Sequence, residues 1–332
     1  MLATVKKGVV LQKPNTYRME LNKVHNIDFL NNDLPDKCAK LIIADPPYYK
    51  VKGEFDFIWK TFEDYLTDVE KWAIECKRIL ADNGTLLWYG DAKNIAYAQI
   101  IFDKHFNLLN HIVWHKMDCQ TNKIKVEDAR SFIPNTERIL MYEKAENYHD
   151  SVRKAIKYVQ DYLLTLISRN DFAELLLKNG NCKNIASAKQ NANNILRQSS
   201  AKPQLITEQQ YNLIPCKKTK TYNELINEYK LIQRPFNPTE KYKMDVLRVS
   251  QEGHITGKYD HDTVKPEKLT RILITTCSRE NDLVVVPFAG SGTECAMSAK
   301  EKRPFVAYEI TEKHAKMSQY RSNKILKEPT LF

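Results

Sequence analysis

Four consecutive residues, Asp45-Pro46-Pro47-Tyr48, carry groups that could act together on an aromatic amine. The Asp45 carboxylate and the Pro46 carbonyl can each accept one amine hydrogen, and Pro47 has no N–H to compete for that carbonyl. Two such acceptors direct the lone pair of the nitrogen at a methyl donor, by orientation and electrostatic stabilisation. Tyr48 offers a flat face on which a base flipped from a duplex can stack. An ordinary Pro-Pro turn at the end of a strand fits the same four residues, so the tetrapeptide alone leaves both interpretations open.

A second candidate site is the glycine-containing turn Phe288-Ala289-Gly290-Ser291-Gly292-Thr293. The apolar run 283–286 before it predicts a buried strand, and a helix is expected from 293. The glycines let the backbone approach a nucleoside ligand closely, and the amides at a helix N-terminus favour a carboxylate. Glu309 ends the next expected strand, where an acidic side chain can accept ribose hydroxyls. A phosphate-binding loop is disfavoured because no Gly-Lys-Ser/Thr follows the turn.

A third stretch, His261-Asp262-Thr263-Val264-Lys265-Pro266, lies just before an expected helix. Taken alone it is a polar turn and a helix start, with Pro266 near the first helical position.

The elements around these residues alternate between strand and helix. Strands are expected at 41–44, 85–89, 111–114, 138–142, 283–286 and 305–309, and helices at 62–80, 94–102, 264–278 and 293–300. This alternation predicts an α/β fold with a doubly wound, mostly parallel sheet, whose ligands bind at the carboxyl ends of the strands.

Residues 151–250 have a different character. They contain 17 Lys and Arg against 8 Asp and Glu, which is most of the net charge of +10 for the whole chain. A basic segment of this kind suits a polyanion such as DNA, although a solvated lysine-rich surface has the same composition. Helices are expected at 151–167, from a cap at Asp171 to 178, and at 184–197, which outlines a helix-turn-helix. Four prolines at 203, 215, 235 and 238 predict little regular structure after that. The expected domains are therefore 1–148, 149–250 and 251–332.

Composition narrows the class of protein. The chain has 332 residues, of which 42% are hydrophobic and 10% aromatic, so it can bury a core. The seven cysteines contain no Cys-x-x-Cys pair, which disfavours a zinc ribbon or a disulfide framework and suits a reducing, cytoplasmic setting. The first residues contain no long apolar run and the chain has no stretch of 18 apolar residues, so we expect neither a secretory signal nor a membrane span. From the residue types we also expect no metal site.

The three motifs occur in an order that resembles the beta group of DNA amino-methyltransferases. That group has Asp-Pro-Pro-Tyr first, a recognition region next, and the cofactor loop last, so its Rossmann-like methyltransferase fold is permuted. The resemblance covers about 1–145 and 258–320, and Asn135 to Leu140 is a lesser match. It implies a site-specific enzyme that moves a methyl group from S-adenosyl-L-methionine to N6 of adenine in double-stranded DNA by base flipping. It further implies that Asp45, Pro46, Pro47 and Tyr48 hold the base, and that the cofactor lies against Asp28, Thr263, Lys265, the 288–293 turn and Glu309.

Two residues depart from the family pattern. The family often has Asp where this chain has Val286, near the amino group of the cofactor, and Asn where it has Tyr49. Alternatives are a cytosine-N4 DNA methyltransferase, which more often carries Ser-Pro-Pro-Tyr, and a catalytically silent DNA-binding relative. Methylation of a protein glutamine is disfavoured by the Asp and by the motif order. The resemblance leaves the recognition sequence, a homodimer and a separate restriction endonuclease open.

Overall fold

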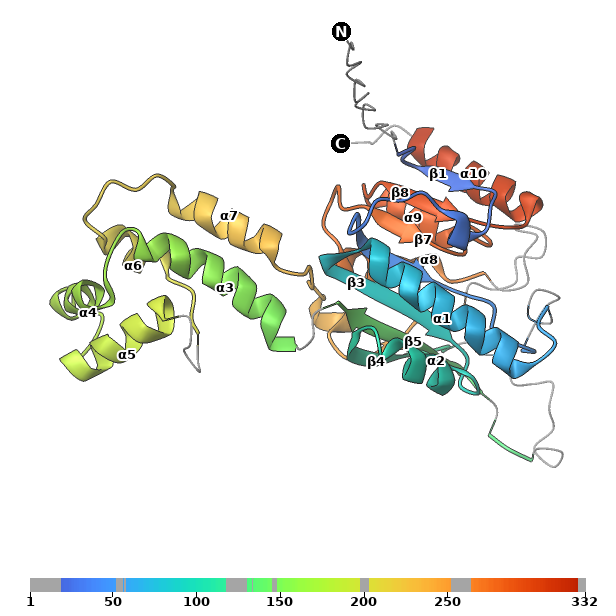
Figure 1. The fold of residues 1–332 in the computed structure, drawn as a ribbon, viewed down its shortest axis with the longest axis horizontal. Helices are drawn as coiled ribbons and strands as arrows, with labels where there is room; N and C mark the ends of the chain where they lie inside the picture. The colour runs from blue at the N-terminus through green and yellow to red at the C-terminus, as the bar shows by residue number, and fades with distance from the viewer. Residues whose placement is uncertain are drawn as a thin grey trace, which may run out of the picture.

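The computed structural model describes residues 19–51, 56, 58–117, 130–132, 134–144, 148–197, 203–251 and 264–327. Within them, strands form one sheet in the order β1-β8-β7-β2-β3-β5-β4-β6 (Figure 1). Antiparallel pairing is confined to β3 with β5 and β4 with β5, and the other described pairs are parallel. The expected α/β class with a mostly parallel sheet is confirmed. The strands are β1 (Lys23–His25), β2 (Ala39–Ala44), β3 (Leu80–Gly90), β4 (Asn107–His115), β5 (Thr136–Glu143), β6 (Val246–Arg248), β7 (Val284–Val286) and β8 (Phe305–Tyr308).

Helices cover both faces of this sheet, because its central strands are apolar on both sides. In β2, Ile42 packs into the core beneath α1 (Phe62–Ile79) and α2 (Ile95–Phe102). Its neighbour Ile43 points to the opposite face, which is covered by α8 (Glu267–Cys277), α9 (Thr293–Lys300) and α10 (Glu312–Lys327). Successive strand residues alternate between faces, so one apolar run supplies two cores.

Local sequence sets the ends of α1. Thr61 and Asp64 form a reciprocal capping box at its N-terminus, and Tyr65, Val69 and Trp72 recur on its buried face. The helix ends at Ile79 and β3 begins at Leu80. The helix expected at 62–80 is therefore confirmed within one residue, whereas β3 begins five residues before the strand that was expected from 85.

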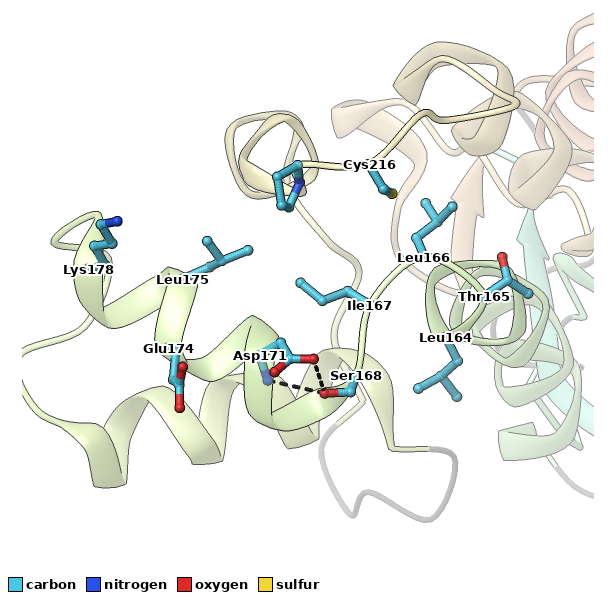
Figure 2. A pocket seen from close by; sticks show the side chains of 11 residues that line it. Leu164, Thr165, Leu166, Ile167, Ser168, Asp171, Glu174, Leu175, Lys178 and Cys216 are labelled. Carbon is cyan, nitrogen blue, oxygen red and sulfur yellow. Dashed lines mark hydrogen bonds between the residues drawn. The ribbon is translucent and has the colours of Figure 1, made fainter.

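A separate helical lobe follows β5 (Figure 1). It contains α3 (Tyr148–Leu164), α4 (Arg169–Lys178), α5 (Ile185–Leu196), α6 (Glu208–Leu213) and α7 (Tyr222–Ile232). These helices share their own apolar core, which includes Phe172, Leu176 and Tyr211. The predicted cap of α4 was wrong: Ser168 is the N-cap, and its hydroxyl donates to the Asp171 carboxylate at 2.6 Å (Figure 2).

The expectation of little regular structure after residue 203 was also wrong. Capping boxes start α6 at Thr207 and α7 at Thr221, and Pro215 and Pro235 follow the ends of these helices. A short 3₁₀ helix (Glu240–Tyr242) comes next, and β6 then pairs with β4 in the sheet. The other elements that the sequence analysis did not foresee are β1, a 3₁₀ helix at Phe29–Asn31, and α10.

The C-terminal end of α7 is fastened to the sheet domain. Asn83 donates its side-chain amide to the carbonyl of Leu231 at 2.9 Å, and Arg279 donates to the carbonyl of Gln233 at 3.0 Å. The adjacent Arg234 forms an ion pair with Glu143 at 3.2 Å, and Glu143 is almost fully buried. The C-terminal end of α7 is therefore held to the sheet domain by these hydrogen bonds and by the adjacent ion pair.

Candidate functional site

The residues expected to do chemistry meet at one edge of the sheet. Asp45 follows β2, the 288–293 turn follows β7, and Glu309 follows β8. These three strands are parallel, so their carboxyl ends share an edge. Because β5 runs antiparallel to β3, its first residues also lie there, with Arg138 opposite Gly90. Residues far apart in the chain are thus brought together.

The Asp45-Pro46-Pro47-Tyr48 turn is held by side chains outside it. Asn94 donates its amide to the carbonyls of Tyr48 at 2.5 Å and Tyr49 at 3.1 Å. Asp56 accepts from the backbone N–H of Tyr48 at 2.7 Å. Among the residues that the structure describes, none donates a hydrogen bond to the Pro46 carbonyl, which therefore keeps its accepting capacity.

Tyr49, which replaces the more usual Asn, is turned into an aromatic cluster. Its ring stacks on Tyr65 with centroids 5.6 Å apart and is tilted against Phe62 at 5.2 Å. Its φ is +58°, and Lys50 follows with φ of +53°. Non-glycine residues seldom adopt this conformation, and strain of this kind is often found at functional sites.

Asp45 lies in a cluster of charges. Its Oδ2 is 2.8 Å from Nζ of Lys265, and its Oδ1 accepts a hydrogen bond from the Tyr48 hydroxyl. Lys265 also lies 3.3 Å from Oε2 of Glu137, whose Oε1 accepts from Lys116 at 2.5 Å. Burial opposes the charge of Lys265, but the two carboxylates prevail and raise its pKa above the usual range. The charges of Lys265 and Lys116 hold the pKa of Glu137 below its usual value against burial.

The glycine turn leads directly into α9. Ala289 donates its N–H to the Tyr308 carbonyl at 2.8 Å, which ties the turn to β8. Gly292 is the N-cap residue of α9 with φ of +77°, and an added Cβ would meet the backbone of Ser318 in α10. Arg321 donates to the Ser291 carbonyl at 2.7 Å and to the Thr293 hydroxyl at 3.1 Å. The turn is therefore rigid and packed tightly on α10.

Glu309 faces this turn from the neighbouring strand. Its Oε2 accepts the N–H of Gly290 and its Oε1 accepts that of Thr311, both at 2.9 Å. Each carboxylate oxygen keeps further accepting capacity, so hydroxyl groups of a ligand can still bind it. Phe288 packs edge-on against Trp72, with ring centroids 4.9 Å apart, and supplies an aromatic wall.

The remaining predicted residues are less central. Asp28 is exposed and accepts the N–H of Leu30 at 2.9 Å, so its carboxylate caps the first 3₁₀ helix. The adjacent Phe29 contacts the Phe288 ring at a centroid distance of 6.3 Å, which places Asp28 near the glycine turn. Thr263 lies outside the described residues. Lys265 belongs to the charge cluster described above.

Sequence reasoning missed several residues of this edge. Asn94, before α2, and Lys116, after β4, belong to none of the three motifs, and Glu137 was noted only within the lesser family match from Asn135 to Leu140. Glu294, in the first turn of α9, is 4% exposed, and its Oε1 has no hydrogen-bond partner among the described residues. Burial and then the Asp45 charge raise its pKa to about 7. The sequence signal that could have identified Glu294 is an acidic residue directly after the 288–293 turn.

Other features lie away from this edge. A surface hollow in the helical lobe is lined by residues from Leu164 to Lys178 together with Pro215 and Cys216 (Figure 2). In the described part of the chain, no group of three or more His, Cys, Asp or Glu could hold a metal ion. Nor is any described helix both long and apolar enough to cross a membrane.

Comparisons with known proteins agree on one family. A family model described as DNA methylase matches residues 39–320. The chain is 23% identical over 321 residues to the Type II methyltransferase M1.MboII of Moraxella bovis, covering 92% of this chain and 98% of that protein. It is 25% identical over 294 residues to the DNA adenine methyltransferase YhdJ of Escherichia coli (strain K12), covering 87% and 77%.

Solved structures show the same fold. The DNA modification methylase TTHA0409 of Thermus thermophilus, in complex with S-adenosyl-L-methionine, superposes with a TM-score of 0.51 at 17% identity, covering 92% of this chain and 95% of that one. The complex of M1.HpyAVI with the same cofactor gives 0.50 at 17% identity, covering 90% and 98%.

Proposed function

The chain belongs to the DNA methylase family, and from that premise we propose that it transfers a methyl group from S-adenosyl-L-methionine to the exocyclic N6 of adenine in DNA. The observation that carries the proposal is the pair of acceptors at the end of β2: the Asp45 carboxylate and the Pro46 carbonyl. The pair lies beside the glycine turn, since β2 and β7 are adjacent and parallel. The name of the relative YhdJ, a DNA adenine methyltransferase, supports adenine as the base.

The residues at the edge fit the cofactor chemically. Glu309 is a carboxylate with spare accepting capacity for ribose hydroxyls, and Phe288 is an aromatic wall for a nucleoside. Oε1 of Glu294, which has no hydrogen-bond partner in the described part of the chain, is buried at the start of α9, where a positively charged group of a ligand would be favoured. When bound, the cofactor supplies an electrophilic methyl group on a sulfonium. We propose that the 288–293 turn and Glu309 hold it, with Asp28 and Thr263 nearby.

The roles proposed for the chain itself follow from its contacts. Asp45 and the Pro46 carbonyl accept the two amine hydrogens, so that the nitrogen lone pair points away from the ring plane. Tyr48 stacks on the flipped base. Asn94 holds the turn in place through the carbonyls of Tyr48 and Tyr49.

The test is a methyl-transfer assay with deuterated S-adenosyl-L-methionine and genomic DNA, read by mass spectrometry of the nucleosides. We expect labelled N6-methyladenine from the wild type and a loss of about 100-fold or more in Asp45→Ala, because one preorganised acceptor is worth roughly that in rate. Asp82→Ala is the control, since Asp82 also pairs with a lysine but is exposed near the start of β3, at the opposite edge of the sheet.

Two outcomes would contradict the adenine proposal. Label on cytosine N4 would support the cytosine alternative. DNA binding without label on any base would support a silent relative. Equal rates in Asp45→Ala and the wild type would remove Asp45 from the mechanism.

We also propose that the helical lobe recognises the DNA sequence, and that its basic residues contact phosphates. The enzyme would act in the cytoplasm of a prokaryotic cell or its phage, beside a separate restriction endonuclease. Support comes from the name of the relative M1.MboII, a Type II methyltransferase. Sequencing of host DNA for modified bases, with and without the gene, tests the site and the setting together.

A further inference from the structure

Lys265 is the most heavily engaged side chain of the edge. Three oxygens lie within 3.3 Å of its Nζ: Oδ2 of Asp45 at 2.8 Å, Oε2 of Glu137 at 3.3 Å and the Tyr48 hydroxyl at 3.3 Å. The contact with Glu137 is an ion pair and not a hydrogen bond, because Oε2 of Glu137 has no hydrogen-bond partner among the described residues. The side chain is only 5% exposed. The family resemblance implies that the cofactor lies against Lys265, yet the ammonium of Lys265 already contacts three oxygens of the protein.

The charges around Lys265 alternate in sign. Lys116 pairs with Glu137, Glu137 with Lys265, and Lys265 with Asp45, so two positive and two negative groups balance. A buried charge is tolerated only when it is paired in this way. The described groups that face Asp45 or Lys265 are Tyr48 beside Asp45, Tyr89 of β3, Lys116 after β4, Glu137 of β5 and Glu294 of α9.

The two oxygens of Asp45 have different partners. Oδ2 contacts Lys265, which is itself anchored by Glu137 on β5. Oδ1 accepts from the Tyr48 hydroxyl, which is a neutral donor. One oxygen of the carboxylate is thus paired with a cation, and the other accepts from a neutral hydroxyl that a substrate amine could replace.

On the basis of the proposed function, we propose that Lys265, steadied by Glu137, is a positioning residue for Asp45: it fixes Oδ2 and keeps Oδ1 as the charged acceptor for the substrate amine. Tyr48 occupies Oδ1 until the base arrives. Neither Lys265 nor Glu137 touches the reacting atoms in this arrangement. Both act through the orientation of Asp45 and the charges around it.

The test compares the pH dependence of single-turnover methylation in Lys265→Met and Glu137→Gln. A neighbouring cation favours the charged form of a carboxylate, so the acid limb of the methylation rate should move to higher pH in Lys265→Met. Removing the negative neighbour has the opposite effect, so the limb should move to lower pH in Glu137→Gln. Single-turnover rates are used because product release often limits kcat in enzymes.

Three comparisons sharpen the result. Lys265→Arg keeps the charge and should return the acid limb toward that of the wild type. Lys268→Met, an exposed lysine on α8, should leave the profile unchanged. Binding of S-adenosylhomocysteine, measured by calorimetry, should stay within about twofold of the wild type in Lys265→Met, because each tenfold loss requires about 1.4 kcal/mol of lost contacts.

A loss of S-adenosylhomocysteine affinity of tenfold or more in Lys265→Met, with the acid limb unmoved, would overturn the proposal and make Lys265 a cofactor ligand. If the acid limb of the pH profile stays at its wild-type position in both variants, Lys265 and Glu137 only stabilise the fold. If Lys265→Met does not fold, as judged by thermal unfolding, the nearly isosteric Glu137→Gln decides alone. A wild type that methylates no adenine would refute the proposed function, whereas an active wild type with unmoved limbs refutes only the role of Lys265.

Discussion

Replacing Gly292 with alanine tests the packing of the glycine turn against α10. Gly292 has φ of +77°, and a Cβ built on it would lie 2.6 Å from the Cα of Ser318, far inside van der Waals contact. Gly180, in the turn between α4 and α5, has nearly the same φ of +72°, but a Cβ there would meet nothing within 4 Å. An alanine at either position would therefore have the same backbone strain, but only an alanine at 292 would also clash with its surroundings.

The magnitudes follow from that difference. An alanine in the left-handed region costs about 1 to 2 kcal/mol, and both variants carry this cost. Overpacking a rigid contact costs about 1 to 3 kcal/mol more, which applies to Gly292→Ala alone. The expected losses of unfolding free energy are thus about 1 to 2 kcal/mol for Gly180→Ala and about 2 to 5 kcal/mol for Gly292→Ala.

Urea unfolding can follow each part of the chain separately. All four tryptophans, at 59, 72, 88 and 114, lie outside the helical lobe, so their fluorescence reports the sheet domain, while far-ultraviolet circular dichroism also reports the lobe. Ser318→Gly in the Gly292→Ala background removes the Oγ and Cβ contacts but leaves the Cα, so recovery should be partial. Equal losses in the two glycine variants, within about 0.5 kcal/mol, would refute the steric argument, because surface-like changes fall in that range.

Two further predictions concern charge. The pKa of Glu294 is raised from 4.5 to about 7, so its contribution to the free energy of unfolding is complete below pH 4.5 and is lost as pH rises through 7. By pH 8 this loss is on the order of 3 kcal/mol. Glu294→Gln should abolish this pH-dependent decline in stability. Urea unfolding at pH 5 and pH 8 measures it, and parallel pH dependences in the two proteins would contradict it. Lys183→Glu with Lys189→Glu, both exposed in the helical lobe, should lower DNA affinity and reduce the salt slope by about 2. Lys324→Glu on α10 is the control. An unaltered salt slope in the double variant would show that these two lysines face solvent and do not contact DNA phosphates.

Local signals were enough to predict the elements that carry the motifs. The apolar run before Asp45 became β2, and the run before the glycine turn became β7, each within about two residues of its expected bounds. Such runs are bounded by proline and glycine, which act through the backbone of their own segment. By the same logic the helix after the glycine turn starts at Thr293, as predicted.

Contacts between distant segments were not predictable. No local sequence signal predicts that Lys265 lies beside Glu137. The two residues meet because β5 runs antiparallel to β3, so β5 starts at the edge of the sheet where the parallel strands end. The strand β1 has three residues and exists through pairing with β8 from the far end of the chain. Helices α6 and α7 were missed for another reason. Their capping boxes at Thr207 and Thr221 were present, but the nearby prolines were interpreted as excluding helices when they follow helix ends.

The helical lobe leaves the sheet domain after β5 and returns at β6, and both strands pair with β4. The two ends of the inserted segment are thus kept close by β4, whatever lies between them. Loop closure becomes only about 0.6 kcal/mol more costly with each doubling of length, so the sheet would tolerate a lobe of quite different size. The lobe also contacts the sheet domain through the end of α7, which accepts hydrogen bonds from Asn83 and Arg279. A chimaera that keeps β4, β5, β6 and Arg234, the partner of the buried Glu143, should accept a different lobe at little cost to the catalytic edge.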